Sequence, residues 1–158
     1  MKIGQYLFIL GIIAGCQASQ DTEPFDRSKV EYEVITMLND YHIAIKEGGF
    51  AAEFDYLDQS NDFFWIPPGY ESALDFDSVK TILLGSASAF EHVDLDWETL
   101  QAYPLSNTIA TYSGIVKGTM TDTTGVDNDV RILESGTLIR REDGWQLLSG
   151  QSRMLETK

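Results

Sequence analysis

Apolar residues in the first third of the chain recur at helical intervals. Steps of three and four residues separate Val30, Val34, Met37, Leu38, Tyr41 and Ile45. This spacing predicts an amphipathic helix with one apolar face. Ser28 and Glu31 have capping-box spacing and predict its start, and Gly48-Gly49 predicts its end. The helical spacing continues at Phe50, Phe54 and Leu57. We therefore expect two helices joined at the glycines.

A short strand and a third helix follow. Residues 62–66, Asp-Phe-Phe-Trp-Ile, form a β-type run that ends at Pro67-Pro68-Gly69. Asp75 or Asp77 is a suitable cap for the next helix. The expected buried positions of that helix are Phe76, Val79, Ile82 and Leu83.

From residue 92 onward the spacing of the apolar residues changes from the helical period to a period of two. Apolar and polar residues alternate along 92–98, which predicts a half-buried antiparallel strand with an acidic outer side. Residues 108–120 form a longer β run, in which Gly114 and Gly118 predict bulges or bends. Residues 131–153 read as two strands folded about a turn at Asp143-Gly144. Helices first and strands afterwards predict an α+β fold, with helices on one face of a curved antiparallel sheet.

Composition and charge narrow the class of protein. With 158 residues, 43% apolar and 23% charged, the chain has the composition of one globular domain plus an N-terminal segment. Asp and Glu number 25 against 11 Lys and Arg, which gives a formal net charge of −14. A field of this sign repels phosphate backbones, so we expect no nucleic-acid binding. The simpler explanation of this acidic composition is that it keeps the protein soluble.

The first sixteen residues have the features of a secretory signal. Lys2 precedes an apolar run over 6–13, which is too short for a membrane span of about 20 residues. Ile13-Ala14-Gly15-Cys16 resembles the bacterial lipobox, which implies cleavage before Cys16 and a lipid thioether on its sulfur. The alternative is a plain signal peptide with an incidental cysteine. Cys16 is the only cysteine, so no disulfide partner competes for it.

These features divide the chain into three parts. Residues 1–15 are predicted to be a lipoprotein signal peptide, 16–27 a lipidated polar tether and 28–158 the folded domain. The lipid on Cys16 implies attachment to a membrane of the bacterial cell envelope. Gln17 is not the Asp that retains enterobacterial lipoproteins at the inner membrane, which favours the outer membrane, on its periplasmic or surface face.

Three motifs in this order resemble the nuclear transport factor 2-like superfamily, in its SnoaL-like or DUF4440-type branch. They are Glu47-Gly-Gly-Phe50, Asp62-Phe-Phe-Trp-Ile-Pro-Pro-Gly69 and the terminal run of 136–152 around Asp143-Gly-Trp145. The resemblance spans roughly residues 28–155, and the order and spacing are more specific than any one motif. It implies a cone-shaped antiparallel sheet, with about three N-terminal helices packed on its concave face and a pocket at the open end.

The chain departs from this family pattern on its last strand. Relatives often carry histidines after the Asp-Gly-Trp turn, at positions that match Ser149 and Gln151. Neither Ser nor Gln acts as a general base near neutral pH. A histidine-based reaction is therefore not expected.

Acid–base chemistry by carboxylates is the enzymatic hypothesis that the resemblance implies. Ketosteroid isomerases and SnoaL-type cyclases use a carboxylate base, with hydroxyl or carboxylic donors that stabilise an enolate. In that case Asp62 or Glu134 abstracts a proton, and Tyr41 or Tyr112 polarises the carbonyl. The alternatives are core packing for the tyrosines and a turn position for Asp62. Glu134 could also pair with Arg153 on the neighbouring strand, which would weaken it as a base.

The aromatic residues favour a cavity for an apolar ligand that is neutral or cationic. Phe63, Phe64 and Trp65 are consecutive, so at least one points away from the core side of its strand. The candidate ligand-binding residues are Trp65, Trp97, Tyr112 and Gln151. The two histidines, His42 and His92, have no His or Cys neighbour at ligand spacing, so we expect no metal and no cofactor.

Three functions remain open from the sequence. The first is a lipid-anchored envelope protein whose cone-shaped pocket binds a small apolar molecule or a protein partner. The alternative is a general acid–base isomerase, dehydratase or cyclase. The third is an oligomeric envelope adaptor that forms a homodimer through its sheet. An inward carboxylate within hydrogen-bond reach of a tyrosine would favour the enzyme.

Overall fold

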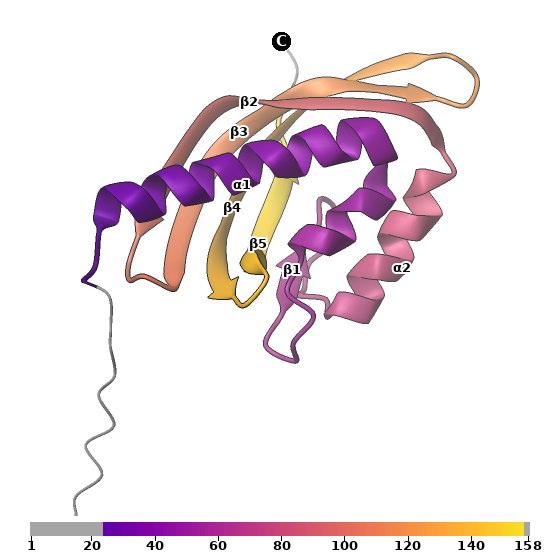
Figure 1. Cartoon of the computed structure of the whole chain (residues 1–158). Coiled ribbons are helices and arrows are strands. Elements are labelled where there is room, and N and C mark those ends of the chain that lie inside the picture. Colours follow the sequence, from indigo (N-terminus) through magenta and orange to yellow (C-terminus); the bar gives the residue numbers. More distant parts are fainter. Residues whose placement is uncertain (1–23, 157–158) are drawn as a thin grey trace, which may run out of the picture.

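The computed structural model describes residues 24–156. The predicted signal peptide and Cys16 lie outside this range. The described residues form three helical segments and one five-stranded sheet (Figure 1). The α+β class predicted from the order of helices and strands is therefore confirmed. Within residues 24–156, no helix has both the length and the apolar character needed to cross a bilayer.

The first helix, α1, spans Arg27–Gly48. Its N-cap is Asp26, whose carboxylate accepts a hydrogen bond of 3.1 Å from the backbone N–H of Lys29. The predicted cap at Ser28 is wrong, because Asp26 occupies the capping position two residues earlier. Gly49, at φ 69°, ends the helix in a conformation that favours glycine. A 3₁₀ segment, η1, then spans Phe50–Tyr56, which confirms a helical pair joined at the glycines.

The second helix, α2, follows the short strand β1, Phe64–Ile66. It spans Phe76–Ala87, and its N-cap is Asp75, which accepts from the backbone N–H of Ser78 at 2.9 Å. Asp75 is thus the cap, and Asp77 lies in the first turn of the helix.

The remaining strands are long. They are β2 (Phe90–Pro104), β3 (Ile109–Asp122), β4 (Asp127–Arg141) and β5 (Gly144–Met154). The strand order is β1-β5-β4-β3-β2. All neighbours pair antiparallel except β1 with β5, so the sheet is mixed rather than wholly antiparallel. The parallel pair arises because α2 separates β1 from the other strands and carries the chain to the opposite edge.

Irregular pairing accompanies the curvature of the sheet. In the β2–β3 pair the register shifts between Phe90 and His92 and between Trp97 and Thr99, and the extra residue of each bulge lies on β2. A third register shift lies between Thr137 and Leu138 in the β4–β5 pair.

Gly114 and Gly118, the glycines predicted to mark bulges or bends, lie on β3 opposite Leu100 and Leu95 of β2, and the register of β3 with β4 is unbroken. A side chain at either glycine would collide with the backbone of β2. They are needed for close approach of the strands.

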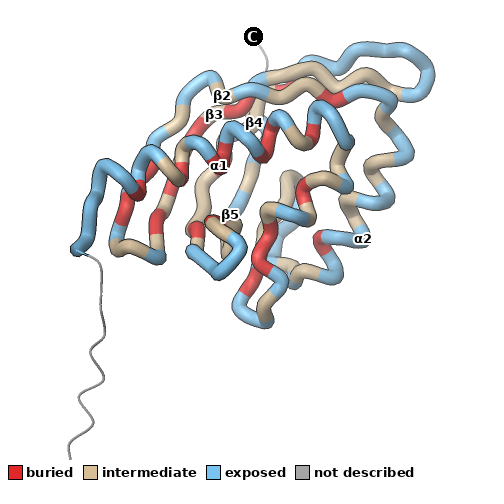
Figure 2. Tube along the Cα trace, in the orientation of Figure 1, coloured by how far each residue is buried: buried red, intermediate tan, exposed pale blue. Residues whose placement is uncertain are grey.

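The concave face of the sheet holds the core. α1 crosses this face, and η1 and α2 lie on the same side (Figure 1). Buried positions gather along α1 and the strands behind it (Figure 2). The predicted turn at Asp143-Gly144 connects β4 to β5, with Gly144 at φ 121°. Just after it, the Trp145 indole N–H donates to Glu33 on α1 at 3.0 Å, which attaches the hairpin to the helix.

Candidate functional site

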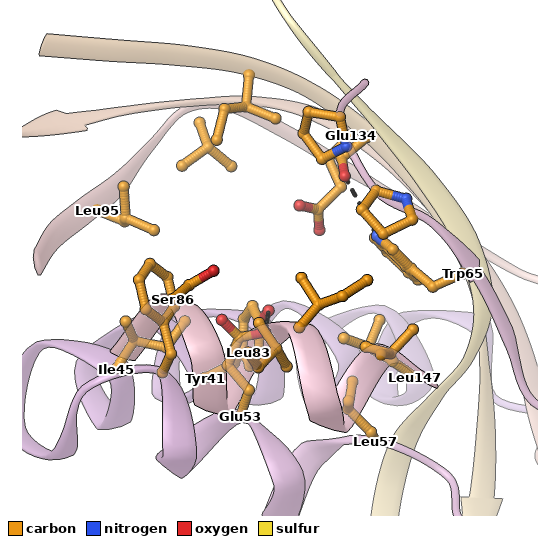
Figure 3. Close-up of a pocket in the computed structure, with 18 of the residues that line it drawn as sticks. Tyr41, Ile45, Glu53, Leu57, Trp65, Leu83, Ser86, Leu95, Glu134 and Leu147 are labelled. Atoms are coloured by element: carbon orange, nitrogen blue, oxygen red, sulfur yellow. Dashed lines mark hydrogen bonds between the residues drawn. The ribbon is translucent and has the colours of Figure 1, made fainter. Parts of the chain in front are cut away.

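A cavity of about 440 Å³ lies between the helices and the concave face of the sheet. Its wall is mainly aliphatic and aromatic, with contributions from α1, η1, α2 and all five strands. In Figure 3, Glu134 enters the cavity from the sheet, while Tyr41 and Glu53 face it from the helical side. The volume is within the range of small-molecule sites.

Glu134 reaches the cavity because β4 directs alternate residues to its concave face. It is 8% exposed and accepts a 2.5 Å hydrogen bond at Oε1 from the hydroxyl of Tyr112 on β3. Burial raises the pKa of Glu134 to about 7, although the bond from Tyr112 lowers that pKa in part. Glu134 is therefore a carboxyl group that exchanges a proton near neutral pH.

Glu53 forms a second pair on the opposite wall. Tyr41, on the buried stripe of α1, donates its hydroxyl hydrogen to Glu53 Oε2 at 2.8 Å. Burial raises the pKa of Glu53 to about 8; Tyr41 lowers that pKa in part, and the charge of Glu134 raises it further. At neutral pH most Glu53 side chains are protonated.

The two tyrosines remain hydrogen-bond donors over the working pH range. Burial, followed by the charge of Glu53, holds the pKa of Tyr41 well above its usual value. Burial and Glu134 do the same to the pKa of Tyr112. Tyr41 and Glu53 thus line the cavity as one pair from the helical side, and Glu134 lines it from the sheet with Tyr112 as its partner behind the wall.

Three of the four predicted catalytic candidates come together here. Tyr41, Tyr112 and Glu134 belong to the two pairs, whereas Asp62 is exposed in the turn before β1. Asp62 therefore lies apart from the cavity carboxylates. The proposed pair of Glu134 with Arg153 is also wrong, because Arg153 lies opposite Leu133 in the register of β4 and β5.

The predicted ligand-binding residues have different positions. Trp65 lines the cavity, and its indole N–H donates to Ser152 at 3.2 Å. Trp97 packs behind the wall and donates to the Leu38 carbonyl at 3.2 Å. Tyr112 does not line the cavity and donates its hydroxyl hydrogen to Glu134. Gln151 lies in a shallow groove on the outer face of the sheet, away from the cavity.

Glycines on neighbouring strands make room for three of these aromatic rings. A methyl group at any of these glycines would overlap the ring beside it. The ring and glycine pairs are Trp97 with Gly114, Tyr112 with Gly136 and Trp65 with Gly150. The rings can therefore lie across the sheet and support the cavity wall.

Sequence reasoning missed Glu53 and the packing of His42. Glu53 lies three residues after Phe50 and four before Leu57, which places it on the apolar face of η1. This position on the apolar face was the sequence signal that could have identified Glu53 as a buried carboxylate.

His42 lines the cavity and stacks on Trp97 at 4.6 Å between ring centroids. Burial lowers the pKa of His42 to about 4, so it is neutral at pH 7. Among residues 24–156, no cluster of three His, Cys, Asp or Glu side chains could hold a metal ion.

No family model matches the sequence, and comparison with curated proteins gave no match either. Solved structures do match. A nuclear transport factor 2-like superfamily protein from Salmonella enterica aligns at a TM-score of 0.70 and 14% identity, over 83% of this chain and 94% of the other. The chain has the nuclear transport factor 2-like fold. The resemblance to this superfamily that the sequence motifs indicated is therefore confirmed for the fold.

Two further structures extend the comparison. A candidate dehydratase of the same family from Streptomyces avermitilis has a TM-score of 0.71 at 13% identity, over 84% of this chain and all of the other. A ketosteroid isomerase-like protein from Erwinia carotovora has a TM-score of 0.65 at 19% identity, over 80% and 96%. At these identities the likeness establishes the fold, and function has to be argued from the cavity itself.

Proposed function

We propose that the protein is a general acid–base catalyst that isomerises or dehydrates a small, neutral, apolar carbonyl compound. The observation that carries the proposal is the placement of Glu53 and Glu134 on opposite walls of one apolar cavity, each with a tyrosine hydroxyl that donates to it. Their carboxyl groups titrate near neutral pH, which suits groups that transfer protons.

The two carboxyl groups have different roles. Ionised Glu134 removes a proton from the carbon next to the substrate carbonyl, while Tyr112 keeps the carboxylate oriented. Protonated Glu53, held by Tyr41, donates a hydrogen bond to the carbonyl oxygen as negative charge develops there. Glu134 then returns the proton to a different carbon, which completes an isomerisation. Positioned proton transfer of this kind contributes roughly 10²- to 10⁴-fold to a rate.

The wall of the cavity defines the class of substrate. None of the described lining residues is Lys or Arg, and two of them are glutamates. A carboxylate or phosphate would therefore enter without a counter-charge and next to acidic groups. A neutral apolar ring compound fits both this electrostatics and the volume.

The named activities of similar folds support the proposal by analogy. The Erwinia structure is described as ketosteroid isomerase-like and the Streptomyces structure as a candidate dehydratase. Both names refer to proton transfer next to a functional group of a small molecule. The analogy adds weight to the geometry and does not replace it.

Hydrogen–deuterium exchange tests the proposed base directly. Small cyclic ketones are incubated with the protein in D₂O, and loss of the α-proton signals is followed by NMR. We expect Glu134→Gln to slow exchange by about 100-fold or more. The exchange rate should rise as pH passes about 7, where Glu134 ionises, and fall above about 8, where Glu53 loses its proton.

Asp62→Asn is the matched control, because Asp62 is an exposed carboxylate outside the cavity. It should leave the exchange rate unchanged. Exchange that is no faster than in buffer, or equal rates in wild type and Glu134→Gln, would contradict catalysis. The cavity would then support the other function considered from the sequence, which is ligand binding without chemistry.

A further inference from the structure

One polar side chain of the cavity wall takes no part in the proposed reaction. His42, on α1, lines the cavity and is 5% exposed. Its Nδ1 atom is enclosed and has no hydrogen-bond partner, and no described residue bonds to Nε2 either. Because buried polar groups almost always have a partner, this unpaired imidazole requires a physical explanation.

The surroundings of His42 determine which nitrogen carries the hydrogen. Burial lowers the pKa of His42 to about 4, although the charge of Asp96 opposes this shift, so the imidazole is neutral at pH 7. A neutral imidazole has one N–H donor and one bare nitrogen. Enclosed N–H groups without an acceptor are rarer than enclosed acceptors without a donor, which assigns the hydrogen to Nε2. Of the two nitrogens only Nδ1 is enclosed, so the Nε2–H group is the one that a ligand can reach.

Ring contacts place His42 near both carboxyl groups of the cavity. Its ring centroid lies 5.3 Å from that of Tyr41, which bonds to the carboxyl group on the helical side. It also lies 4.6 Å from the ring centroid of Trp97. The Trp97 ring in turn lies 6.0 Å from the ring of Tyr112, the partner of the carboxyl group on the sheet. A ring compound between the two carboxyl groups therefore lies within reach of the imidazole.

Packing alone does not require histidine at this position. A phenylalanine ring could also stack on Trp97, and it would leave no polar atom unpaired inside the protein. The proposed reaction does not require the imidazole either, because Glu134 takes the proton and Glu53 bonds to the carbonyl oxygen. The donor of His42 is therefore left for another part of the bound molecule.

We propose that the ketone bound in the cavity carries a second oxygen atom on its ring system, and that His42 donates a hydrogen bond from Nε2 to this oxygen. The second oxygen belongs to an ether, a hydroxyl or another carbonyl group, all of which accept hydrogen bonds. The inference rests on the proposed function and narrows its substrate class to ring ketones with two oxygens. His42 is then a specificity residue, which selects the ketone without contact to the carbon that loses its proton.

Matched pairs of ligands test this inference. Methoxytetralones, with the methoxy group at each position of the aromatic ring in turn, place an acceptor oxygen on a fused-ring ketone. The corresponding methyltetralones have a similar shape and no second oxygen. Isothermal titration calorimetry with the full chain gives a Kd for each compound. We expect at least one methoxy compound to bind about threefold to tenfold more tightly than its methyl counterpart, which is the usual effect of one neutral hydrogen bond.

His42→Phe should abolish this preference and retain an aromatic ring against Trp97. It should not lower the unfolding temperature, because it removes an unpaired polar atom from the interior. In deuterium exchange of the preferred ketone, the variant should raise KM by a larger factor than it lowers kcat. His92→Phe is the matched control, since His92 is an exposed histidine on β2 that does not line the cavity, and it should keep the preference.

Equal affinities within every methoxy and methyl pair would overturn the inference, and this comparison needs only the wild-type protein. A preference that persists in His42→Phe, or that His92→Phe removes to the same extent, would also overturn it. The binding assay needs no turnover, so the inference and the proposed function fail separately. A methoxy preference without ketone exchange contradicts only the reaction, and ketone exchange without the preference contradicts only the second oxygen.

Discussion

Two buried glutamates decide the chemistry of the cavity at the scale of single residues. Glu134 was a candidate from the sequence because it is a carboxylate on the predicted hairpin of residues 131–153. Glu53 was not, because it belongs to a short 3₁₀ segment whose apolar face is recognised only once its neighbours are placed. Each glutamate is 8–9% exposed, so each resists ionisation.

This resistance predicts a pH-dependent stability. The pKa of Glu134 rises from 4.5 to about 7 on folding, and that of Glu53 to about 8. Between pH 4.5 and these values the unfolded chain releases protons that the folded chain retains. The contribution of each glutamate to the free energy of unfolding is therefore complete below pH 4.5. It is lost as pH rises from 4.5 to the folded-state pKa, at up to about 1.4 kcal/mol per pH unit.

Glu134→Gln and Glu53→Gln should each reduce the loss of stability with rising pH, because Gln cannot ionise. Urea unfolding at pH 5 and pH 8 measures the difference. We expect wild type to lose more stability over this interval than either variant, and the variants to be the more stable proteins at pH 8. Asp62→Asn provides the exposed control and should retain the wild-type slope. Parallel slopes in all four proteins would show that the carboxyl groups ionise without cost.

At the scale of elements, glycines determine how the strands and aromatic rings fit. The sequence marked Gly114 and Gly118 as special strand positions, and the structure shows that they serve close approach rather than a bulge. A glycine in a strand is compatible with either role. The choice depends on the partner strand, which local sequence does not specify.

Gly150→Ala should destabilise the sheet. A methyl group at this position would overlap the Trp65 ring and the Ser135 carbonyl. We expect a loss of about 1–3 kcal/mol in free energy of unfolding, the usual cost of overpacking. Gly85→Ala in α2 is a control of opposite sign, since nothing lies within 4 Å and the helix should gain about 0.5–1 kcal/mol. Equal effects of the two substitutions in urea unfolding would disprove the steric argument.

At the scale of the whole molecule, the proposed activity and the proposed cellular location are separate questions. The fold and cavity belong to residues 24–156, whereas the lipobox-like segment precedes them. We retain the proposal that Cys16 carries a lipid and holds the domain at the bacterial cell envelope. This proposal of a lipid on Cys16 rests on the sequence alone.

Replacement of the predicted lipid acceptor tests this location. Cys16→Ser removes the sulfur that would carry the diacylglycerol, so the protein should move from the membrane fraction to the soluble fraction. Detergent partitioning of cells that express each form measures the change. Wild type that is already soluble, or a variant that remains in the membrane fraction, would contradict lipid anchoring through Cys16.

The sequence by itself determined the order of helices and strands, the buried face of α1 and the turn at Asp143-Gly144. These features depend on periodicity and on local backbone preference, which neighbouring residues specify. Only the tertiary structure decided that Glu53 meets Tyr41 and that Glu134 meets Tyr112. It also decided that the two glutamates face one cavity. Such contacts depend on how η1 folds back and on strand register, and both are set by packing between distant parts of the chain.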